Sequence, residues 1–285
     1  MLDILCQLPC PCAGEETVKK YLKTKTKGYE DSIGNFIVNK KGGDKKLMVF
    51  CPLDEDTLTA MSCENKKVFV SHQGSAKLPL GLVVSFGGYL GVLQAKDNTK
   101  PDKDLYVEML TDGFENVGGA GVVSSEYITE ENVIFTKDAV QKLATCAMLE
   151  SVSEETDFDA FFVFGVQSKN NNKGAIVSTR EINPEFVLTF EKTKSETLTY
   201  KVLSKGFIIS ENAKEKIENV CSSLGVEIKP EADSEDVSAA QAFCSPNTVV
   251  VGVPVRFYDE IRQATDIKYK EIIKEIIKAF LREGK

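Results

Sequence analysis

The sequence is poor in the side chains on which many enzymes depend. Its 285 residues include a single histidine, His72, and no tryptophan. A three-histidine zinc site, an HExxH metalloprotease and a Cys2His2 finger each need more than one imidazole, so all three are excluded. A Ser/His/Asp or Cys/His triad would have to use His72.

Positive net charge and a targeting segment are also lacking. With 35 Lys+Arg against 43 Asp+Glu the net charge is −8, which argues against nucleic-acid binding because phosphate affinity depends on clustered basic side chains. No basic stretch precedes an apolar run at the N-terminus, so no secretory signal is predicted. The uncharged segment 78–95 is interrupted by Pro79 and several glycines, which is typical of a β-hairpin and not of a membrane helix. Eight cysteines without paired CxxC spacings indicate free thiols, and we expect a cytoplasmic protein.

Apolar periodicity divides the chain into two kinds of structure. Helical spacing and uninterrupted apolar runs occur at both ends, and such runs predict strands buried on both faces, as in a parallel sheet. Short β-type runs separated by turn residues predict a small barrel-like or sandwich-like unit between them. We therefore predict a discontinuous α/β domain, 1–56 and 135–285, interrupted by a β insertion, 57–134. Three independent domains are the alternative, but they would leave the first segment too short to bury a core. The predicted helices span 15–22, 138–150, 211–223 and 266–282, and the predicted strands of the α/β domain 33–39, 47–51, 161–166, 187–190 and 248–253.

Several strings, in the right order and at the right spacings, carry a family likeness. They include Asp31-Ser32-Ile33-Gly34-Asn35, Leu53-Asp54-Glu55, the helix 144–150 and Val253-Pro254-Val255-Arg256-Phe257. Together they resemble the glutamyl aminopeptidase and tetrahedral aminopeptidase family, some of whose members carry an endoglucanase label. The resemblance covers nearly the whole chain. It implies a phosphorylase/hydrolase-like zinc-peptidase α/β domain with a mostly parallel central sheet and a β insertion through which members form dimers or larger homo-oligomers.

The histidine ligands of that family have no counterpart here. Its members bind two zinc or cobalt ions through two histidines and several carboxylates, with one more Glu as general base. Matched residue by residue, the first histidine falls on Pro52, and the Asp that would orient it is kept as Asp54. The last histidine falls on Asp259, while His72 lies within the insertion.

At the remaining family positions the residues also differ from the family's metal ligands and general base. The bridging Asp falls on Val140, the general base on Ser168, and the other two ligands on Lys169 and Glu191. A shifted register would instead make Asp138 the bridging residue, at the expense of the match over 144–150. The resemblance therefore implies a vestigial site without a confident catalytic residue.

Lys169 suggests how the negative charge of the altered site is neutralised. An ammonium repels a divalent ion, so we predict that Lys169 replaces the missing cation by pairing with Glu191 or Asp259. The alternative is that Lys169 points to solvent from the loop 170–172.

Two other metal sites are conceivable. Asp54, Glu191 and Asp259 could form an all-oxygen site for magnesium, manganese or calcium. A thiolate site is disfavoured because the cysteine spacing matches no standard pattern, so ordinary buried thiols are expected. The cysteines concerned are Cys6, Cys10, Cys12 and Cys51.

The sequence thus predicts an aminopeptidase-family protein without its metal site, catalytically inactive, with a binding, regulatory or structural role. No cofactor is expected, and the expected partners are further copies of the chain and a peptide or amino-acid ligand. The alternative is an active metal-dependent aminopeptidase with a rebuilt carboxylate site.

Overall fold

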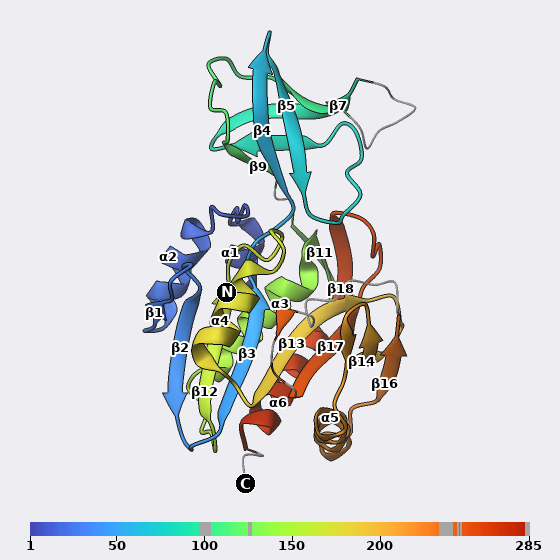
Figure 1. Ribbon diagram of the computed structural model, residues 1–285. Coiled ribbons are helices and arrows are strands. Elements are labelled where there is room, and N and C mark those ends of the chain that lie inside the picture. Colours follow the sequence, from blue (N-terminus) through green and yellow to red (C-terminus); the bar gives the residue numbers. More distant parts are fainter. Residues whose placement is uncertain (97–103, 125–126, 234–241, 244, 246, 283–285) are drawn as a thin grey trace.

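A nine-stranded mixed sheet with helices on both faces forms one part of the molecule, and a closed barrel stands above it (Figure 1). This computed structural model describes residues 1–96, 104–124, 127–233, 242–243, 245 and 247–282. None of the helices in these ranges is long and apolar enough to span a membrane.

The centre of the large sheet is parallel. Its strand order is β1-β2-β12-β3-β13-β17-β14-β15, with β16 beside β14, and the pairs β12–β3, β3–β13 and β13–β17 are parallel. Antiparallel pairs lie toward its edges, so the prediction of a mostly parallel central sheet is confirmed. The strands are β1 (Tyr29–Glu30), β2 (Phe36–Lys41), β3 (Lys46–Pro52), β12 (Asp159–Gly165), β13 (Phe186–Thr193), β14 (Leu198–Ser204), β15 (Phe207–Ile208), β16 (Ile228–Ala232) and β17 (Asn247–Pro254).

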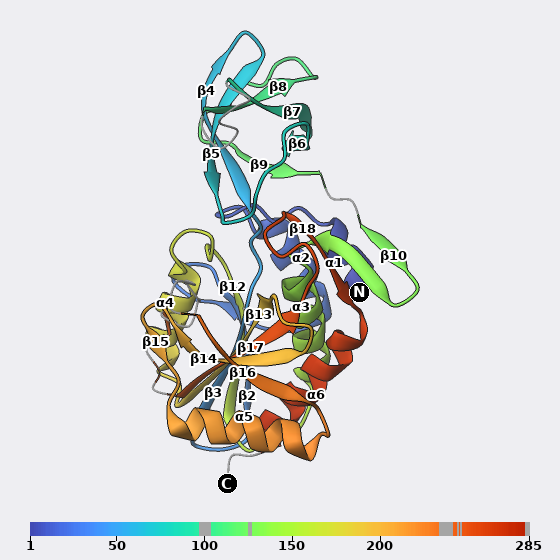
Figure 2. The same cartoon turned by 90° about the vertical axis from the view of Figure 1, so that its right-hand side faces the viewer.

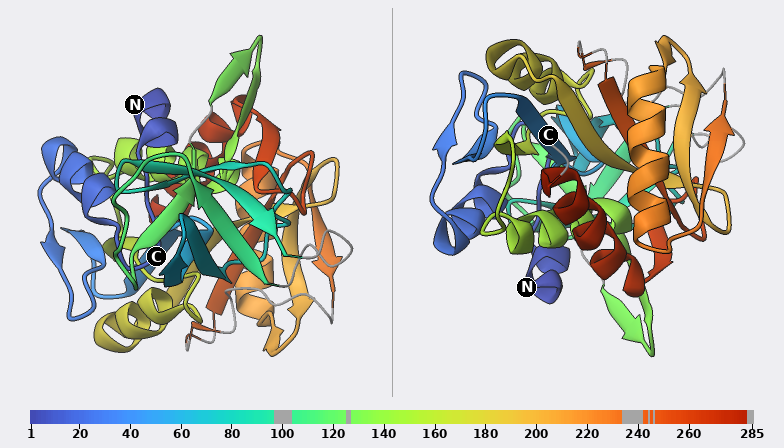
Figure 3. Two further views of the ribbon diagram at one scale, coloured as in Figure 1. Left: turned by 90° about the horizontal axis from the view of Figure 1, so that it is seen from above. Right: turned by 90° about the horizontal axis from the view of Figure 1, so that it is seen from below.

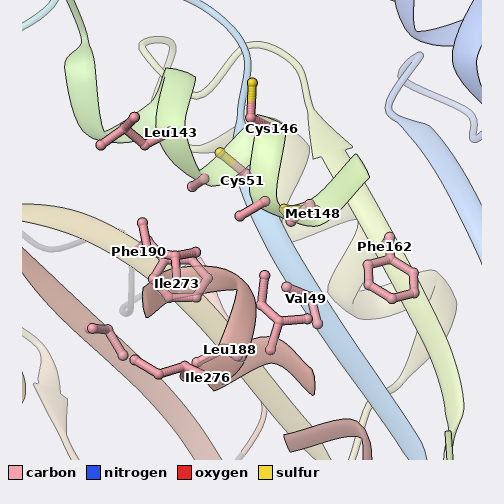
Figure 4. Close-up of a cluster of buried hydrophobic side chains, with 14 of the residues drawn as sticks. Val49, Cys51, Leu143, Cys146, Met148, Phe162, Leu188, Phe190, Ile273 and Ile276 are labelled. Carbon is pink, nitrogen blue, oxygen red and sulfur yellow. The ribbon is translucent and has the colours of Figure 1, made fainter. Parts of the chain in front are cut away.

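Alternating side chains of β3 build two cores. Leu47, Val49 and Cys51 pack with helical residues on one face, whereas Met48 and Phe50 pack on the other. Because both faces are covered, the strand is apolar at every central position. Figure 4 shows the first core, where side chains of three strands meet those of α3 and α6.

Helices α3, α5 and α6 cover the first face, and α4 lies on the opposite one (Figure 3). The apolar stripe of α6 buries Ile273, Ile276, Ile277 and Phe280. The helices are α1 (Leu2–Gln7), α2 (Glu16–Lys25), α3 (Ala139–Ser151), α4 (Lys173–Ile182), α5 (Glu211–Ser223) and α6 (Lys268–Arg282).

The barrel follows directly after the first part of the sheet. Its six antiparallel strands have the order β4-β5-β8-β7-β6-β9. The predicted hairpin within 78–95 is confirmed as β6–β7, in which Val83 faces Val92 and Phe86 faces Tyr89. The strands are β4 (Thr57–Glu64), β5 (Lys67–Gln73), β6 (Val83–Phe86), β7 (Tyr89–Ala95), β8 (Leu105–Met109) and β9 (Ala120–Val123).

A small sheet of three strands lies below the barrel and next to α3 and α6 (Figure 2). It consists of β10 (Ile128–Glu130), β11 (Val133–Lys137) and β18 (Arg262–Asp266). Since β18 comes from the C-terminal part of the chain, β10 and β11 belong structurally with the α/β part, although β10 and the start of β11 fall within the expected insertion, 57–134.

Candidate functional site

A hollow of about 480 Å³ lies at the carboxyl ends of the parallel strands, where open α/β sheets commonly bind ligands. The ends of β3 and β13, the loop after β12, the start of α3 and the base of the barrel form its walls. Its lining residues are Pro52, Gly74, Ser75, Asp138, Gln141, Ser168, Lys169, Asn171, Asn172, Thr189, Phe190, Glu191, Lys192 and Tyr258.

Asp54 anchors the loop that follows β12 through hydrogen bonds to its backbone. Its side chain is 1% exposed, and its two carboxylate oxygens accept hydrogen bonds from the backbone N–H groups of Ser168 (2.9 Å) and Lys169 (2.7 Å). A carboxylate that caps two amides holds the backbone in one position. Asp54 therefore determines where the Lys169 side chain starts.

Lys169 bridges two buried carboxylates. Its Nζ lies 3.2 Å from Asp138 Oδ1 and 3.4 Å from Asp56 Oδ2. Asp138 precedes α3 with a left-handed backbone (φ 45°), and its Oδ2 is buried without a hydrogen-bond partner among the residues that the structure describes. The hollow therefore contains an ion-paired ammonium and an unused acceptor side by side.

Asp56 joins this ion pair to the barrel. Its Oδ1 lies 3.1 Å from His72 Nε2 on β5 and 3.5 Å from the amide nitrogen of Ala76. The backbone at Gly74 passes so close that a Cβ there would lie 1.2 Å from Asp56 Oδ1. The one histidine of the sequence thus contacts the site from the insertion, as a neighbour of Asp56.

The pKa values follow from these contacts. Burial alone would lower the pKa of Lys169, but Asp138, Asp56 and Asp54 outweigh it and raise that pKa well above its usual range. Burial alone would raise the pKa of Asp56, but the Lys169 ammonium and the His72 hydrogen bond lower it well below its usual range. Lys169 is therefore a permanent cation and Asp56 a permanent anion at neutral pH.

The structure brings only some of the sequence-predicted positions together. Pro52, Ser168, Lys169 and Glu191 line the hollow, and Asp54 lies beneath its loop. The other two predicted positions, Val140 and Asp259, do not line the hollow.

Val140 and Asp259 lie elsewhere. Val140, in the first turn of α3, is fully buried in the hydrophobic core, and Asp138, two residues earlier, faces the hollow. The side chain of Asp259 is 53% exposed and lies 4.0 Å from Lys194.

The expected partners of Lys169 were wrong. We predicted pairing with Glu191 or Asp259, or a side chain in solvent, whereas the Lys169 side chain is only 17% exposed and its ammonium pairs with Asp56 and Asp138. The prediction failed because the ungapped match put the acidic position on Val140 and took no account of Asp56.

The donor set does not suit the two-metal site of the resembled family. One imidazole is available, and it contacts Asp56. The Lys169 ammonium lies between the two carboxylates that would otherwise attract a cation, and like charges at ~4 Å repel by roughly 4 kcal/mol at an effective dielectric of about 20, about twice that for a divalent ion.

Another group of potential ligand atoms lies below the loop. Within the described ranges, one group of three possible ligand atoms lies within 4.8 Å of one another, and it comes from Cys12, Glu15 and Asp54. The predicted set of Asp54, Glu191 and Asp259 does not form such a group. Glu15 accepts hydrogen bonds from Ala13 and Gln167 amides, and Asp54 is engaged with the loop. Burial, followed by the neighbouring Asp54 carboxylate, raises the pKa of Cys12 to about 12, so its thiol stays protonated.

The other predicted thiols are also buried. Cys6, Cys10 and Cys51 are free, and burial raises the pKa of Cys51 to about 12. Cys244 lies outside the described residues.

Sequence reasoning missed Asp56 and the contact of His72. The signal for Asp56 was the run Asp54-Glu55-Asp56 directly after a buried strand, where parallel strands place their functional side chains. His72 reaches Asp56 through the β4–β5 hairpin, in which it lies opposite Leu58, and the sequence offered no signal for this contact because β4 was not predicted as a strand.

Comparison with known proteins supports the fold. No protein-family model matches the chain. It is 24% identical over 181 residues to a "putative aminopeptidase" of Acetivibrio thermocellus, a match that covers 57% of this chain and 54% of that protein. The match thus extends over about half the length of this curated relative.

Solved structures resemble nearly the whole chain. An aminopeptidase of the archaeon Desulfurococcus kamchatkensis has a TM-score of 0.87 at 20% identity, over 99% of this chain and 93% of that one. The TET1 peptidase of Pyrococcus horikoshii, described as assembling into a tetrahedron or a large octahedral shell, has a TM-score of 0.84 at 16% identity, over 99% and 98% of the chains. An endoglucanase of Thermotoga maritima has 0.81 at 20% identity, over 100% and 97%. The chain therefore has the fold of the tetrahedral aminopeptidases.

Proposed function

We propose that this protein keeps the aminopeptidase fold without its metal-dependent hydrolysis and uses the hollow to bind a ligand. The observation that carries the proposal is the ion pairing of Lys169 with Asp56 and Asp138. The ammonium neutralises the carboxylates without offering an open coordination site, so it cannot polarise a peptide carbonyl or activate water as a metal does.

A metal-free hydrolytic mechanism lacks its base. Ser168 occupies the position that the resemblance gives to the general base, and its buried Oγ has no hydrogen-bond partner among the described residues. The one imidazole lies against Asp56. A serine nucleophile needs a base within hydrogen-bond reach, and nothing in the described part of the chain supplies it.

The proposed ligand is an amino acid or a short peptide. Asp138 Oδ2 is a buried acceptor without a partner, which favours a ligand ammonium group. Lys192 lines the same hollow and can donate to a ligand carboxylate. A ligand with both groups would fit this charge pattern.

Thermal unfolding with single amino acids and dipeptides, combined with release assays on aminoacyl chromogenic substrates, tests the proposal. Some ligands should raise the melting temperature of the wild-type protein without turnover, since a ligand that binds only the folded state stabilises it. Asp138→Asn should abolish the shift, and Lys173→Met, on the exposed start of α4, should retain it. Metal-dependent turnover of these substrates would contradict the proposal.

We also propose a cytoplasmic protein that self-associates through the barrel. The seven described cysteines are free, which fits a reducing compartment. The barrel exposes several large apolar side chains, among them Met61, Leu110 and Val117. A loss of self-association in Leu110→Asp, measured by light scattering, would support the barrel contact, and an unchanged molar mass would contradict it.

A further inference from the structure

His72 brings a hydrogen-bond donor of the barrel to the ion pair in the hollow. Its Nε2 lies 3.1 Å from Oδ1 of Asp56, and its side chain is 20% exposed, against 4% for that of Asp56. Because a carboxylate anion only accepts hydrogen bonds, the imidazole donates from Nε2. Asp56 therefore receives one of its hydrogen bonds from β5, a strand of the insertion.

The segment that follows His72 leaves the Asp56 carboxylate little room to turn. The backbone of Gly74 passes so close that a Cβ there would lie 1.2 Å from Oδ1, and the amide nitrogen of Ala76 lies 3.5 Å from the same oxygen. The other oxygen, Oδ2, faces Lys169. A carboxylate that is enclosed in this way cannot turn to solvent when it loses a donor, so it has to draw more on the donors that remain.

One ammonium is shared between two carboxylates in the hollow. Nζ of Lys169 lies 3.2 Å from Asp138 Oδ1 and 3.4 Å from Asp56 Oδ2, so neither carboxylate holds it alone. Asp56 also has the imidazole of His72 as a donor, whereas Oδ2 of Asp138 has no hydrogen-bond partner among the described residues. The share of the ammonium that Asp138 receives therefore depends on how well His72 satisfies Asp56.

We infer that His72 is a positioning residue, which sets how the Lys169 ammonium is divided between Asp56 and Asp138 and thereby how strongly Asp138 binds a ligand ammonium group. This role rests on the ligand function proposed above. Without the imidazole, Asp56 has to take a larger part of the Lys169 ammonium, because a buried carboxylate with too few donors is costly. Asp138 is then left with more uncompensated negative charge, and a ligand ammonium should bind to it more tightly.

Calorimetric titration of the full chain with the dipeptide alanyl-alanine compares wild type with two variants of His72. His72→Leu fills a similar volume without a donor and should bind the dipeptide at least about fivefold more tightly, a coupling within the range found between linked groups. His72→Gln can donate to Asp56 from its side-chain amide and should bind the dipeptide as wild type does. Ser71→Ala, at the exposed neighbouring position of β5, is the matched control and should also bind as wild type does.

The direction of the change separates positioning from a general loss of structure. A loosened site would bind the dipeptide more weakly, whereas a redistributed ammonium makes the binding tighter. In Lys169→Met no ammonium is divided between the carboxylates, so adding His72→Leu to that variant should leave its affinity for the dipeptide unchanged. Circular dichroism checks that each variant is folded.

NMR of the nitrogen-labelled lysine ammonium groups gives a readout that needs no ligand. The signal of Lys169, assigned by its absence in Lys169→Met, should shift in His72→Leu and keep its wild-type position in His72→Gln. Equal or weaker binding of the dipeptide by folded His72→Leu, or an unchanged Lys169 signal in it, overturns the inference. A displaced Lys169 signal in His72→Gln overturns it as well, whether or not His72→Leu folds. If wild type does not bind alanyl-alanine, the proposed ligand is contradicted, and the Lys169 signal still decides whether His72 positions the ammonium.

Discussion

Replacing Lys169 with methionine should be strongly destabilising. The substitution keeps the length of the side chain and removes the charge that pairs with Asp56 and Asp138. Both residues are at least 94% buried, at 6% and 5% exposure, so the substitution would leave Asp138 without its ion-pair partner and Asp56 with His72 alone in a low-dielectric environment. Removing one member of a buried ion pair costs ~3–5 kcal/mol, and we expect about 3 kcal/mol because the lysine keeps some contact with solvent.

Urea and thermal unfolding measure this loss. About 3 kcal/mol corresponds to a decrease of roughly 6–12 °C in melting temperature for a chain of this size class. Lys173→Met, on the exposed start of the following helix, should cost less than about 0.5 kcal/mol and serves as the control.

A double-mutant cycle with Asp138→Asn isolates the pair. The two substitutions together should cost less than the sum of the single ones, with a coupling of roughly 1–3 kcal/mol. A loss below about 1 kcal/mol for Lys169→Met, or strict additivity, would refute the reasoning that Lys169 holds these carboxylates.

Other parts of the site give further predictions. Gly74→Ala should cost at least ~2 kcal/mol more than Gly81→Ala in urea unfolding, because both glycines have positive φ values but only at position 74 would a Cβ meet Asp56; equal costs would assign the effect to backbone strain alone. Asp54→Asn should increase hydrogen exchange at the two loop amides that its carboxylate binds, and unchanged protection would contradict its role as their anchor. The pKa of Asp56 is lowered in the folded protein, so the stabilisation it gives is complete above the unfolded pKa of about 4 and is lost as the pH falls through the folded pKa. Asp56→Asn should therefore lose less stability than wild type between roughly pH 5 and pH 2. Parallel curves of unfolding free energy against pH would contradict this.

Much of the fold was predictable from local sequence. The strands 47–51 and 161–166 and the helix 211–223 agree with β3, β12 and α5 within a few residues, because apolar runs and a Ser210 cap specify them locally. Several elements were missed, among them α4 and β4. The sequence of α4 contains Gly174 and β-branched residues, and β4 mixes apolar with polar side chains, so neither has a clear period.

The candidate site was predictable only in part. The resemblance put Lys169 on a family ligand position, and the structure places it in the hollow at the carboxyl ends of the parallel strands. Lys169 pairs with Asp56 and Asp138 because the start of α3 and the base of the barrel converge around it. A shift of two residues in the match exchanged Asp138 for Val140, and no local pattern shows which of them faces the hollow.

The metal content of the wild-type protein tests the central claim most directly. The protein would be equilibrated with zinc, cobalt or manganese, dialysed, and analysed by elemental mass spectrometry, with Lys169→Ala in parallel. We predict that wild type retains no stoichiometric metal, because the Lys169 ammonium occupies the position between Asp56 and Asp138 where a cation would be attracted. Stoichiometric metal in wild type, retained with Lys169 present, would contradict the account.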